Sequence, residues 1–307
     1  MITNDYQAIL ERIRKEVKPL LSKGKVANYI PPLGGISPDK FGMSVCTVDG
    51  QMFTTGDVDE TFSIQSISKV LSLTLAINLL PDSIWERLGR EPSGNPFNSL
   101  IQLEYEKGRP RNPFINAGAI VIADIIMEHV ENAPEDLINF VRKLSDNDSI
   151  DYDKNIAAAE KKFGHTNRAL ANFIKSFGNL DNDVEAVLDL YFHQCSIAMS
   201  CTDLARAFSF LANKGRSAIS NEEVVTTATA KRINAVMITC GLYDDVGDFA
   251  YRVGLPGKSG VGGGIVAVVP GELSVAVWSP GLNEHGNSLA GVKALELFTT
   301  YADNSIF

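Results

Sequence analysis

The chain has 307 residues, of which 45% are hydrophobic and 21% charged, so it can bury a large core in one domain or two interleaved ones. Its formal net charge of −9 argues against nucleic acid or an anionic membrane as the main partner. Charged side chains between Asp5 and Lys18 argue against a signal peptide, and no run approaches the roughly 18 apolar residues of a membrane span. We therefore expect a cytoplasmic protein.

The N-terminal third of the chain predicts a helix, a hairpin and a second helix, in that order. Apolar residues at helical spacing predict the first helix over 6–21. Alternation on both sides of the Asp49-Gly50 turn predicts a β-hairpin over 41–55. Residues 66–80 are apolar on nearly every side, which is typical of a buried helix.

The remainder predicts helices as far as about residue 240 and strands after it. The clearest helical patterns cover 119–129, 134–144, 167–177, 184–192 and 202–213. Short β-rich runs follow, and a last helix closes the chain; these lie at 249–254, 264–269, 273–279 and 288–301.

Strands near both chain ends with helices between them predict an α/β fold of the α+β kind. We expect an antiparallel sheet flanked by the terminal helices, with a helical domain inserted into it. The sheet domain would comprise 1–60 and 241–307, and the inserted domain 61–240. Ligand sites tend to lie between domains, so the active site is expected in the cleft between these two.

A serine and a lysine three residues apart open the second predicted helix. Ser-x-x-Lys occurs three times, but only the pair Ser66 and Lys69 begins a long buried helix. Residues three apart share a helix face, so Lys69 can reach the Ser66 hydroxyl, and the helix N-terminus adds free N–H groups. The alternative is a serine that only caps the helix, beside a solvated lysine.

A second motif, Lys258-Ser259-Gly260, precedes a glycine-dense run and a β-rich segment. Glycine lets a backbone approach a substrate closely, and in penicillin-recognising serine hydrolases such a strand edge faces Ser-x-x-Lys. One alternative is a P-loop, but Arg252 stands where its first glycine belongs, and a strand rather than a helix is expected next. The other is a glycine-rich turn without chemistry.

The remaining polar motifs are weaker. Ser145-Asp146-Asn147 spells a penicillinase triplet, but its setting after a helix favours a solvated loop. Tyr191 ends an apolar helix and is the better proton-relay candidate; two nearby lysines would lower its pKa, although an ordinary core tyrosine is the alternative. The four cysteines show no C-x-x-C spacing and the histidines are scattered, so we expect reduced thiols and no metal or cofactor.

Longer motifs run through essentially the whole chain, and together they resemble those of the serine-dependent L-glutaminases, in that family's order. With no added N-terminal or ankyrin-type segments, the chain resembles the compact bacterial form. The motifs are Gln65–Lys69, Asn112–Ala119, Thr166–Leu170, Tyr191–Ser196, Cys240–Asp244, Gly254–Gly264 and Gly286–Gly291.

The resemblance implies a β-lactamase-like fold, a homodimer or homotetramer, and hydrolysis of L-glutamine to L-glutamate and ammonia through a glutamyl-serine intermediate. It implies that Ser66 is the nucleophile and Lys69 its partner. Tyr191 and Lys258 would complete a proton network, and the backbone N–H groups of Ser66 and Val261 would form the oxyanion hole. The implied substrate contacts are Ser66, Asn116, Glu160, Asn167, Tyr191, Tyr243 and Val261.

Three other functions fit parts of this pattern. A penicillin-type hydrolase or esterase would use the same serine and lysines, but a β-lactamase is expected to carry periplasmic targeting, and Glu160 and Asn167 would have no obvious role in it. A non-catalytic amino-acid sensor would not need Ser66 or Lys69. A P-loop nucleotide-binding protein is the most distant alternative.

Overall fold

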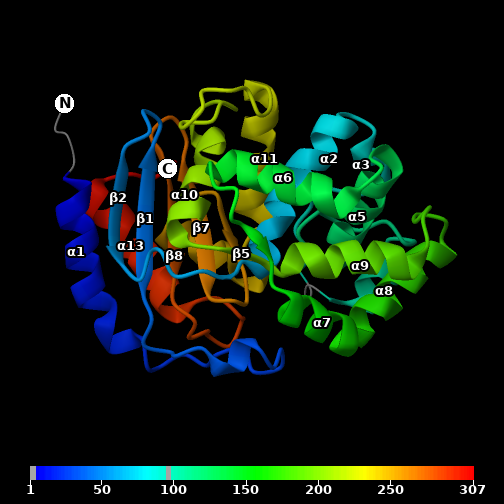
Figure 1. The fold of residues 1–307 in the computed structure, drawn as a ribbon, viewed down its shortest axis with the longest axis horizontal. Coiled ribbons are helices and arrows are strands. Elements are labelled where there is room, and N and C mark those ends of the chain that lie inside the picture. Colours follow the sequence, from blue (N-terminus) through cyan, green and yellow to red (C-terminus); the bar gives the residue numbers. More distant parts are fainter. Residues whose placement is uncertain (1–4, 95–97) are drawn as a thin grey trace.

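A five-stranded antiparallel sheet, assembled from both ends of the chain, forms one half of the molecule (Figure 1). The computed structural model describes residues 5–94 and 98–307. The sheet order is β2-β1-β8-β7-β6, with β1 (Gly42–Thr47), β2 (Met52–Gly56), β6 (Gly257–Ser259), β7 (Gly264–Val269) and β8 (Leu273–Trp278). Strand β1 pairs with β8 in continuous register, from Gly42 opposite Trp278 to Thr47 opposite Leu273. The predicted N-terminal hairpin and the antiparallel sheet are therefore confirmed.

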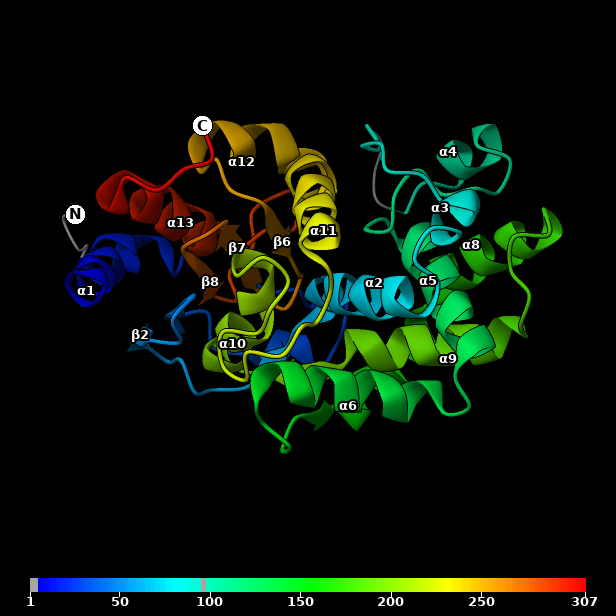
Figure 2. The same ribbon diagram turned by 90° about the horizontal axis from the view of Figure 1, so that it is seen from above.

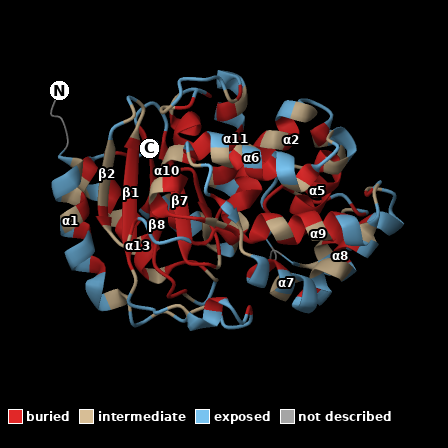
Figure 3. Ribbon diagram, in the orientation of Figure 1, coloured by how far each residue is buried: buried red, intermediate tan, exposed pale blue. Residues whose placement is uncertain are grey.

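Helices cover both faces of this sheet (Figure 2). The terminal helices α1 (Tyr6–Val17) and α13 (Leu289–Ala302) pack on one face, and α10 (Cys201–Ala212) packs on the other. Because side chains alternate along a strand, Val275 and Val277 of β8 join the core under the terminal helices. Ala276 and Trp278 join the core that continues into the helical half. All of β7 and β8 is consequently buried (Figure 3).

The other half is a group of helices around α2 (Ser68–Leu79), α5 (Asn116–His129) and α9 (Val184–Cys195). Nearly all side chains of α2 and α5 are buried, as the apolar pattern of the predicted second helix requires. Among the described residues, no helix is both long and apolar enough to cross a membrane. The surrounding helices are α3 (Ile84–Arg87), α4 (Leu100–Tyr105), α6 (Ala133–Ser145), α7 (Lys154–Phe163), α8 (His165–Ser176) and α11 (Thr227–Cys240).

A small second sheet places the start of α2 beside the end of α9. Its order is β3-β5-β4, with β3 pairing antiparallel to β5. The hydroxyl of Ser63 in β3 also donates to the carbonyl oxygen of Cys195 at 2.8 Å. Two segments more than a hundred residues apart are thereby joined next to Ser66. The strands are β3 (Phe62–Ser63), β4 (Asp151–Tyr152) and β5 (Ile197–Met199).

The prediction of a strand at 249–254 is wrong. The residues form helix α12 (Val246–Arg252), because Phe249 and Val253, four apart, are both buried, whereas Tyr251 between them is 90% exposed. The strand lies further on, as β6. Helix α10, which comes from within 61–240, packs on the sheet, so the division into domains at residues 61 and 240 stays a prediction.

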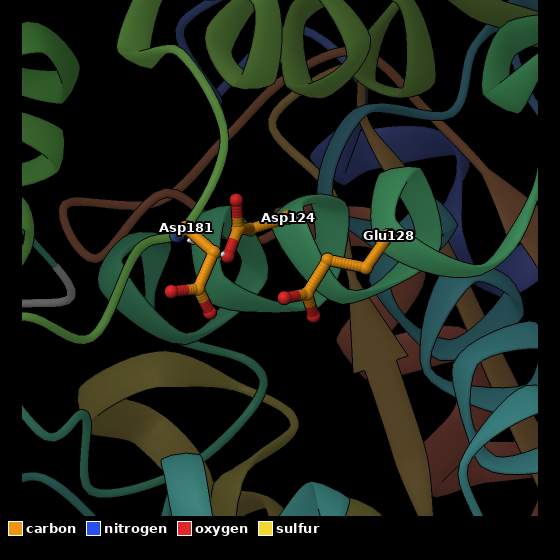
Figure 4. Close-up of side chains that lie close together, drawn as sticks. All are labelled: Asp124, Glu128 and Asp181. Atoms are coloured by element: carbon orange, nitrogen blue, oxygen red, sulfur yellow. Dashed lines mark hydrogen bonds between the residues drawn. The ribbon is translucent and has the colours of Figure 1, made fainter.

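Three carboxylates meet where α5 contacts the loop before α9 (Figure 4). Asp124 is fully buried, and Arg87 pairs with it, with Glu128 at 2.9 Å and with Asp181 at 3.5 Å. Burial raises the pKa of Asp124, but the guanidinium and the backbone N–H groups of Asp181 and Asn182 outweigh it and hold that pKa below its ordinary value. Arg87 is the cation of this group, which holds α5 against the loop before α9 and has a structural role.

Candidate active site

Ser66 lies in a short 3₁₀ turn, Gln65–Ile67, between β3 and the first residue of α2. Gln65 immediately before it has a left-handed backbone, with φ of 49°. The N-cap residue of α2 is Ile67, and no side chain caps that helix end, so Ser66 is not a helix cap. Its hydroxyl is partly accessible at the positive end of a buried helix, where N–H groups lack helix partners.

The loop after β6 lies directly against this turn. A Cβ added to Gly260 would stand 3.3 Å from the amide nitrogen of Ser66, and one added to Gly262 would stand 2.1 Å from the carbonyl oxygen of Ser63. Glycine is required at both positions because any side chain would push the two segments apart. Val261, between these glycines, is therefore held beside Ser66, as the two motifs predict.

Two lysines of the predicted motifs are buried close to residues that line the site. Nζ of Lys69 donates to Oδ1 of Asn116 at 2.7 Å and to the carbonyl oxygen of Phe114 at 3.2 Å. Nζ of Lys258 donates to the carbonyl oxygen of Ser259 at 2.7 Å and lies 4.4 Å from the centroid of the Tyr243 ring. With 1% and 0% of their surface exposed, neither is the solvated lysine of the alternative interpretation.

Burial changes the protonation of these groups. It lowers the pKa of Lys69 to about 8, although the acidic groups Cys195 and Glu160 act in the opposite direction. It also lowers the pKa of Lys258 well below its ordinary value, and the charge of Lys69 adds to this effect. Lys69 can therefore lose its proton near neutral pH, which a lysine in water does not do, and Lys258 loses its proton more readily than a lysine in water.

The expectation of a lowered pKa at Tyr191 is wrong. Its phenol is fully buried, and burial, with further contributions from Cys195 and Glu160, raises its pKa well above the ordinary value. Burial likewise raises the pKa of Tyr243 despite hydrogen bonds with Ser66 and Ser259. Both hydroxyls stay protonated at neutral pH and are suited to donate a proton or a hydrogen bond.

A cavity of about 450 Å³ opens in front of Ser66. Every predicted substrate contact lines it: Ser66, Asn116, Glu160, Asn167, Tyr191, Tyr243 and Val261. Asn116 begins α5 and donates from Nδ2 to Oδ1 of Asn167 on α8 at 3.0 Å. Glu160 comes from α7, and burial raises its pKa against a hydrogen bond from Gln65 and the charge of Lys69. Lys69 and Lys258 lie behind the cavity wall.

Comparison with known proteins decides the family. The glutaminase family model matches residues 24–307. The chain belongs to the glutaminase family. A glutaminase of Paraburkholderia phytofirmans is 54% identical over 303 residues, which cover 99% of this chain and all of that one. A glutaminase of Aliivibrio fischeri is 57% identical over 300 residues, 97% of this chain and 98% of the relative.

Solved glutaminase structures share the fold. A probable glutaminase of Bacillus subtilis is 33% identical with a TM-score of 0.89, over 99% of this chain and 98% of that one. A structure of a probable glutaminase from Bacillus subtilis complexed with 6-diazo-5-oxo-L-norleucine is 32% identical with a TM-score of 0.88, over 100% of this chain and 99% of that one. The β-lactamase-like fold is thus confirmed. The reaction of this glutaminase-family chain is hydrolysis of the side-chain amide of L-glutamine to L-glutamate.

The structure adds cavity residues that the sequence did not single out. Gln65, Cys195 and Gly286 stood inside motifs of the glutaminase resemblance without an assigned role, and all three line the cavity. Tyr29 and His285 also line it. Tyr29 comes from an irregular N-terminal segment whose sequence indicates only a loop, so no pattern pointed to it.

Two of the alternative interpretations are settled by this geometry. Ser145 ends α6, Asp146 is left-handed with φ of 53°, and Nδ2 of Asn147 donates to Asp203 at 2.9 Å, so this triplet is a loop, as expected, and does not line the cavity. Lys258 lies in strand β6, and strand β7 follows it, so the P-loop interpretation is wrong.

Proposed function

We propose that this chain hydrolyses L-glutamine by forming a glutamyl ester on Ser66, with a neutral lysine as the base. The observation that supports this most is the arrangement of Ser66, which lies on the cavity side of two buried lysines with lowered pKa values. A serine hydroxyl is a weak nucleophile until an adjacent base takes its proton. Lys69, one helical turn from Ser66, is the base that we assign.

In the first half of the reaction, the Ser66 oxygen attacks the side-chain amide carbon while its proton passes to Lys69. The carbonyl oxygen becomes an oxyanion, and the backbone N–H groups of Ser66 and Val261 stabilise it. One such donor typically contributes about 3–4 kcal/mol to transition-state stabilisation. The C–N bond then breaks, and Tyr191, whose raised pKa keeps it protonated, relays a proton to the leaving ammonia.

In the second half, water attacks the ester carbon and Ser66 recovers its proton, which releases L-glutamate. Lys258 shares this proton network: its low pKa follows from its own burial first and from the charge of Lys69 second. A proton on Lys69 therefore makes a second proton on Lys258 less favourable.

The other cavity residues suit the two charged ends of the amino acid. The α-ammonium needs an anion, and Glu160 supplies a carboxylate in a charge-assisted hydrogen bond. The α-carboxylate needs donors, which the amides of Asn116 and Asn167 and the hydroxyl of Tyr243 provide. Glu160 forms no ion pair with any residue that the structure describes. A hydrogen bond from Gln65 and the charge of Lys69 act on it, and it lines the cavity, where its carboxylate can meet the ligand.

Glu160→Gln is expected to raise KM for glutamine at least about tenfold and to change kcat much less, because it removes a charge that binds the substrate away from the reacting amide. Steady-state kinetics over a range of glutamine concentrations measures both constants. The control is Glu104→Gln, an exposed residue that does not line the cavity. An unchanged KM in the Glu160 variant refutes this assignment.

A mechanism-based reagent tests the covalent step. 6-Diazo-5-oxo-L-norleucine carries a ketone in place of the glutamine amide and a diazo carbon beside it, and it is the compound named in one of the solved B. subtilis structures. We expect it to inactivate the protein with a mass gain equal to the reagent less one N₂, located by peptide mass spectrometry at Ser66. Modification at another residue, with Ser66 unlabelled, contradicts the mechanism.

We further propose that the protein works in the cytoplasm as a homodimer or homotetramer. All four cysteines are buried free thiols, which suits a reducing compartment. Large apolar side chains are exposed together on α4 and the end of α8: Ile101 (68%), Tyr105 (82%) and Phe177 (45%). A patch of this kind supports burial against another subunit.

A further inference from the structure

The cavity rim has two parts that are far apart in the sequence. One is the 3₁₀ turn Tyr243–Asp245, whose first residue lines the cavity. The other is the loop 283–287, which we call the rim loop; its residues Glu284, His285 and Gly286 also line the cavity. A Cβ added to Gly286 would stand 3.7 Å from Cγ1 of Val261, so the rim loop packs beside the assigned oxyanion residue.

Asp245 joins these two parts, although it does not line the cavity itself. Its Oδ2 accepts from Nδ2 of Asn283 at 3.0 Å and from Nδ2 of Asn287 at 2.7 Å. Its Oδ1 lies 3.6 Å from Nε2 of His285. The Asp245 side chain is only 19% exposed, and Asn287 is fully buried, so these bonds are shielded from water.

The orientation of this carboxylate is unusual for its position. Asp245 is the N-cap residue of α12, where an aspartate ordinarily accepts a hydrogen bond from the first turn of its own helix. It makes no such bond. Three other aspartates at helix N-caps in the described residues do cap their own helices: Asp5, Asp153 and Asp183. The carboxylate of Asp245 instead accepts hydrogen bonds from the rim loop.

Hydrogen bonds within the rim loop hold its shape, so a bond from Asp245 to one of its residues fixes the position of the whole loop. Oδ1 of Asn283 accepts from the backbone N–H of His285 at 3.0 Å and of Asn287 at 2.9 Å. The backbone N–H of Asn283 donates to the carbonyl oxygen of Asn287 at 2.8 Å. Asn283 closes the loop with the oxygen of its amide and binds Asp245 with the nitrogen, so the hydrogen bonds of the loop and the bond to Asp245 share one side chain.

We propose that Asp245 is a positioning residue for glutamine recognition, which holds the Tyr243 turn and the rim loop at a fixed separation across the cavity. The proposal rests on the proposed function, because Tyr243 and Val261 are assigned there as substrate contacts. Asp245 touches no substrate. It acts through the two surfaces that it connects, and its effect falls on substrate binding more than on the chemical step.

Asp245→Ala is the direct test, with Asp248→Ala as the matched control. Asp248 is an exposed aspartate of the same helix, α12, and contacts Arg252. We expect KM for glutamine to rise about tenfold in the Asp245 variant and kcat to change by less than about threefold, since hydrogen bonds to a charged acceptor are lost away from the reacting atoms. The Asp248 variant is expected to match the parent in both constants.

An exchange of the bonded groups separates positioning from a loss of stability. Asn283→Asp alone sets two carboxylates against each other, so its KM is expected to rise. In Asp245→Asn alone, the amide oxygen can still accept from Asn283 and Asn287, so its KM is expected to stay within about threefold of the parent. The double variant Asp245→Asn, Asn283→Asp restores an amide opposite a carboxylate, and we expect its KM to fall below that of Asn283→Asp.

Two results would overturn the positioning role: an unchanged KM in a folded Asp245→Ala protein, or a double variant with a KM no lower than that of the worse single variant.

Parent protein and Ser66→Ala are assayed alongside. If the parent hydrolyses glutamine and Ser66→Ala does not, a negative result at Asp245 removes this inference and leaves the proposed function intact. If the parent releases no glutamate, the proposed function itself fails.

Discussion

Ser66→Ala is expected to lower kcat for glutamine hydrolysis by a factor of about 10⁴ or more, because it removes the oxygen that we assign as the nucleophile. The substitution removes one oxygen from a partly accessible side chain that does not cap a helix. We therefore expect the circular dichroism spectrum and the melting temperature to stay close to those of the parent. Release of glutamate and ammonia, each measured by a coupled assay, gives the rate.

The matched control is Ser72→Ala. Ser72 lies on α2 as well, and its hydroxyl donates to the carbonyl oxygen of Lys69 in its own helix, at 3.3 Å. This variant is expected to keep parental activity. Near-normal turnover in a folded Ser66→Ala protein contradicts covalent serine catalysis and removes the basis for every other role assigned in the cavity.

Lys69→Met is expected to reduce kcat by about 10³-fold or more, because methionine fills much of the same space but cannot accept a proton. In the parent protein, the base must be neutral to act. Since burial places the pKa of Lys69 at about 8, kcat/KM is expected to rise as pH increases through that value and then to level off. The pH–rate profile of the parent measures this limb directly.

Stability gives a second readout of the same lysine. The folded-state pKa of about 8 lies below the value of about 10.4 for a lysine in the unfolded chain. The buried charge therefore destabilises the fold fully below pH 8, and this destabilisation disappears as pH rises toward 10.4. Lys69→Met is expected to reduce the rise in unfolding free energy between about pH 8 and 10.4, while the buried Lys258 still contributes to it. A Lys69→Met protein with parental kcat contradicts the assigned base.

Much of the fold follows from patterns that are local in sequence. The hairpin at Asp49-Gly50 and the apolar helix after Ser66 have strong periodic signals, and both form close to where they are predicted. The run 249–254 is rich in aromatic and β-branched residues, which favour a strand, but the burial of Phe249 and Val253 on one side goes with a helix. Tertiary contacts outweighed propensity there.

Only part of the site could likewise be predicted. The glycines at 260 and 262 indicated a close backbone approach, and in the structure the backbone of residues 63–66 lies against them. The raised pKa of Tyr191 could not be predicted from the sequence. Its main cause is burial of the phenol, and the sequence does not show how deeply a side chain is buried. The role of Asp245 could not be predicted either, since an aspartate before a helix indicates a cap and nothing local indicates a partner forty residues away.

The pairing of β1 with β8 has a consequence for biosynthesis. Translation produces the first hairpin long before the strand that covers its free edge, so nascent chains carry an open β-edge for most of their synthesis. Chains cut short before Leu273 never acquire that cover, and they are candidates for chaperone capture and precipitation. A strand that is made late in synthesis is thus what covers the edge of the earliest hairpin.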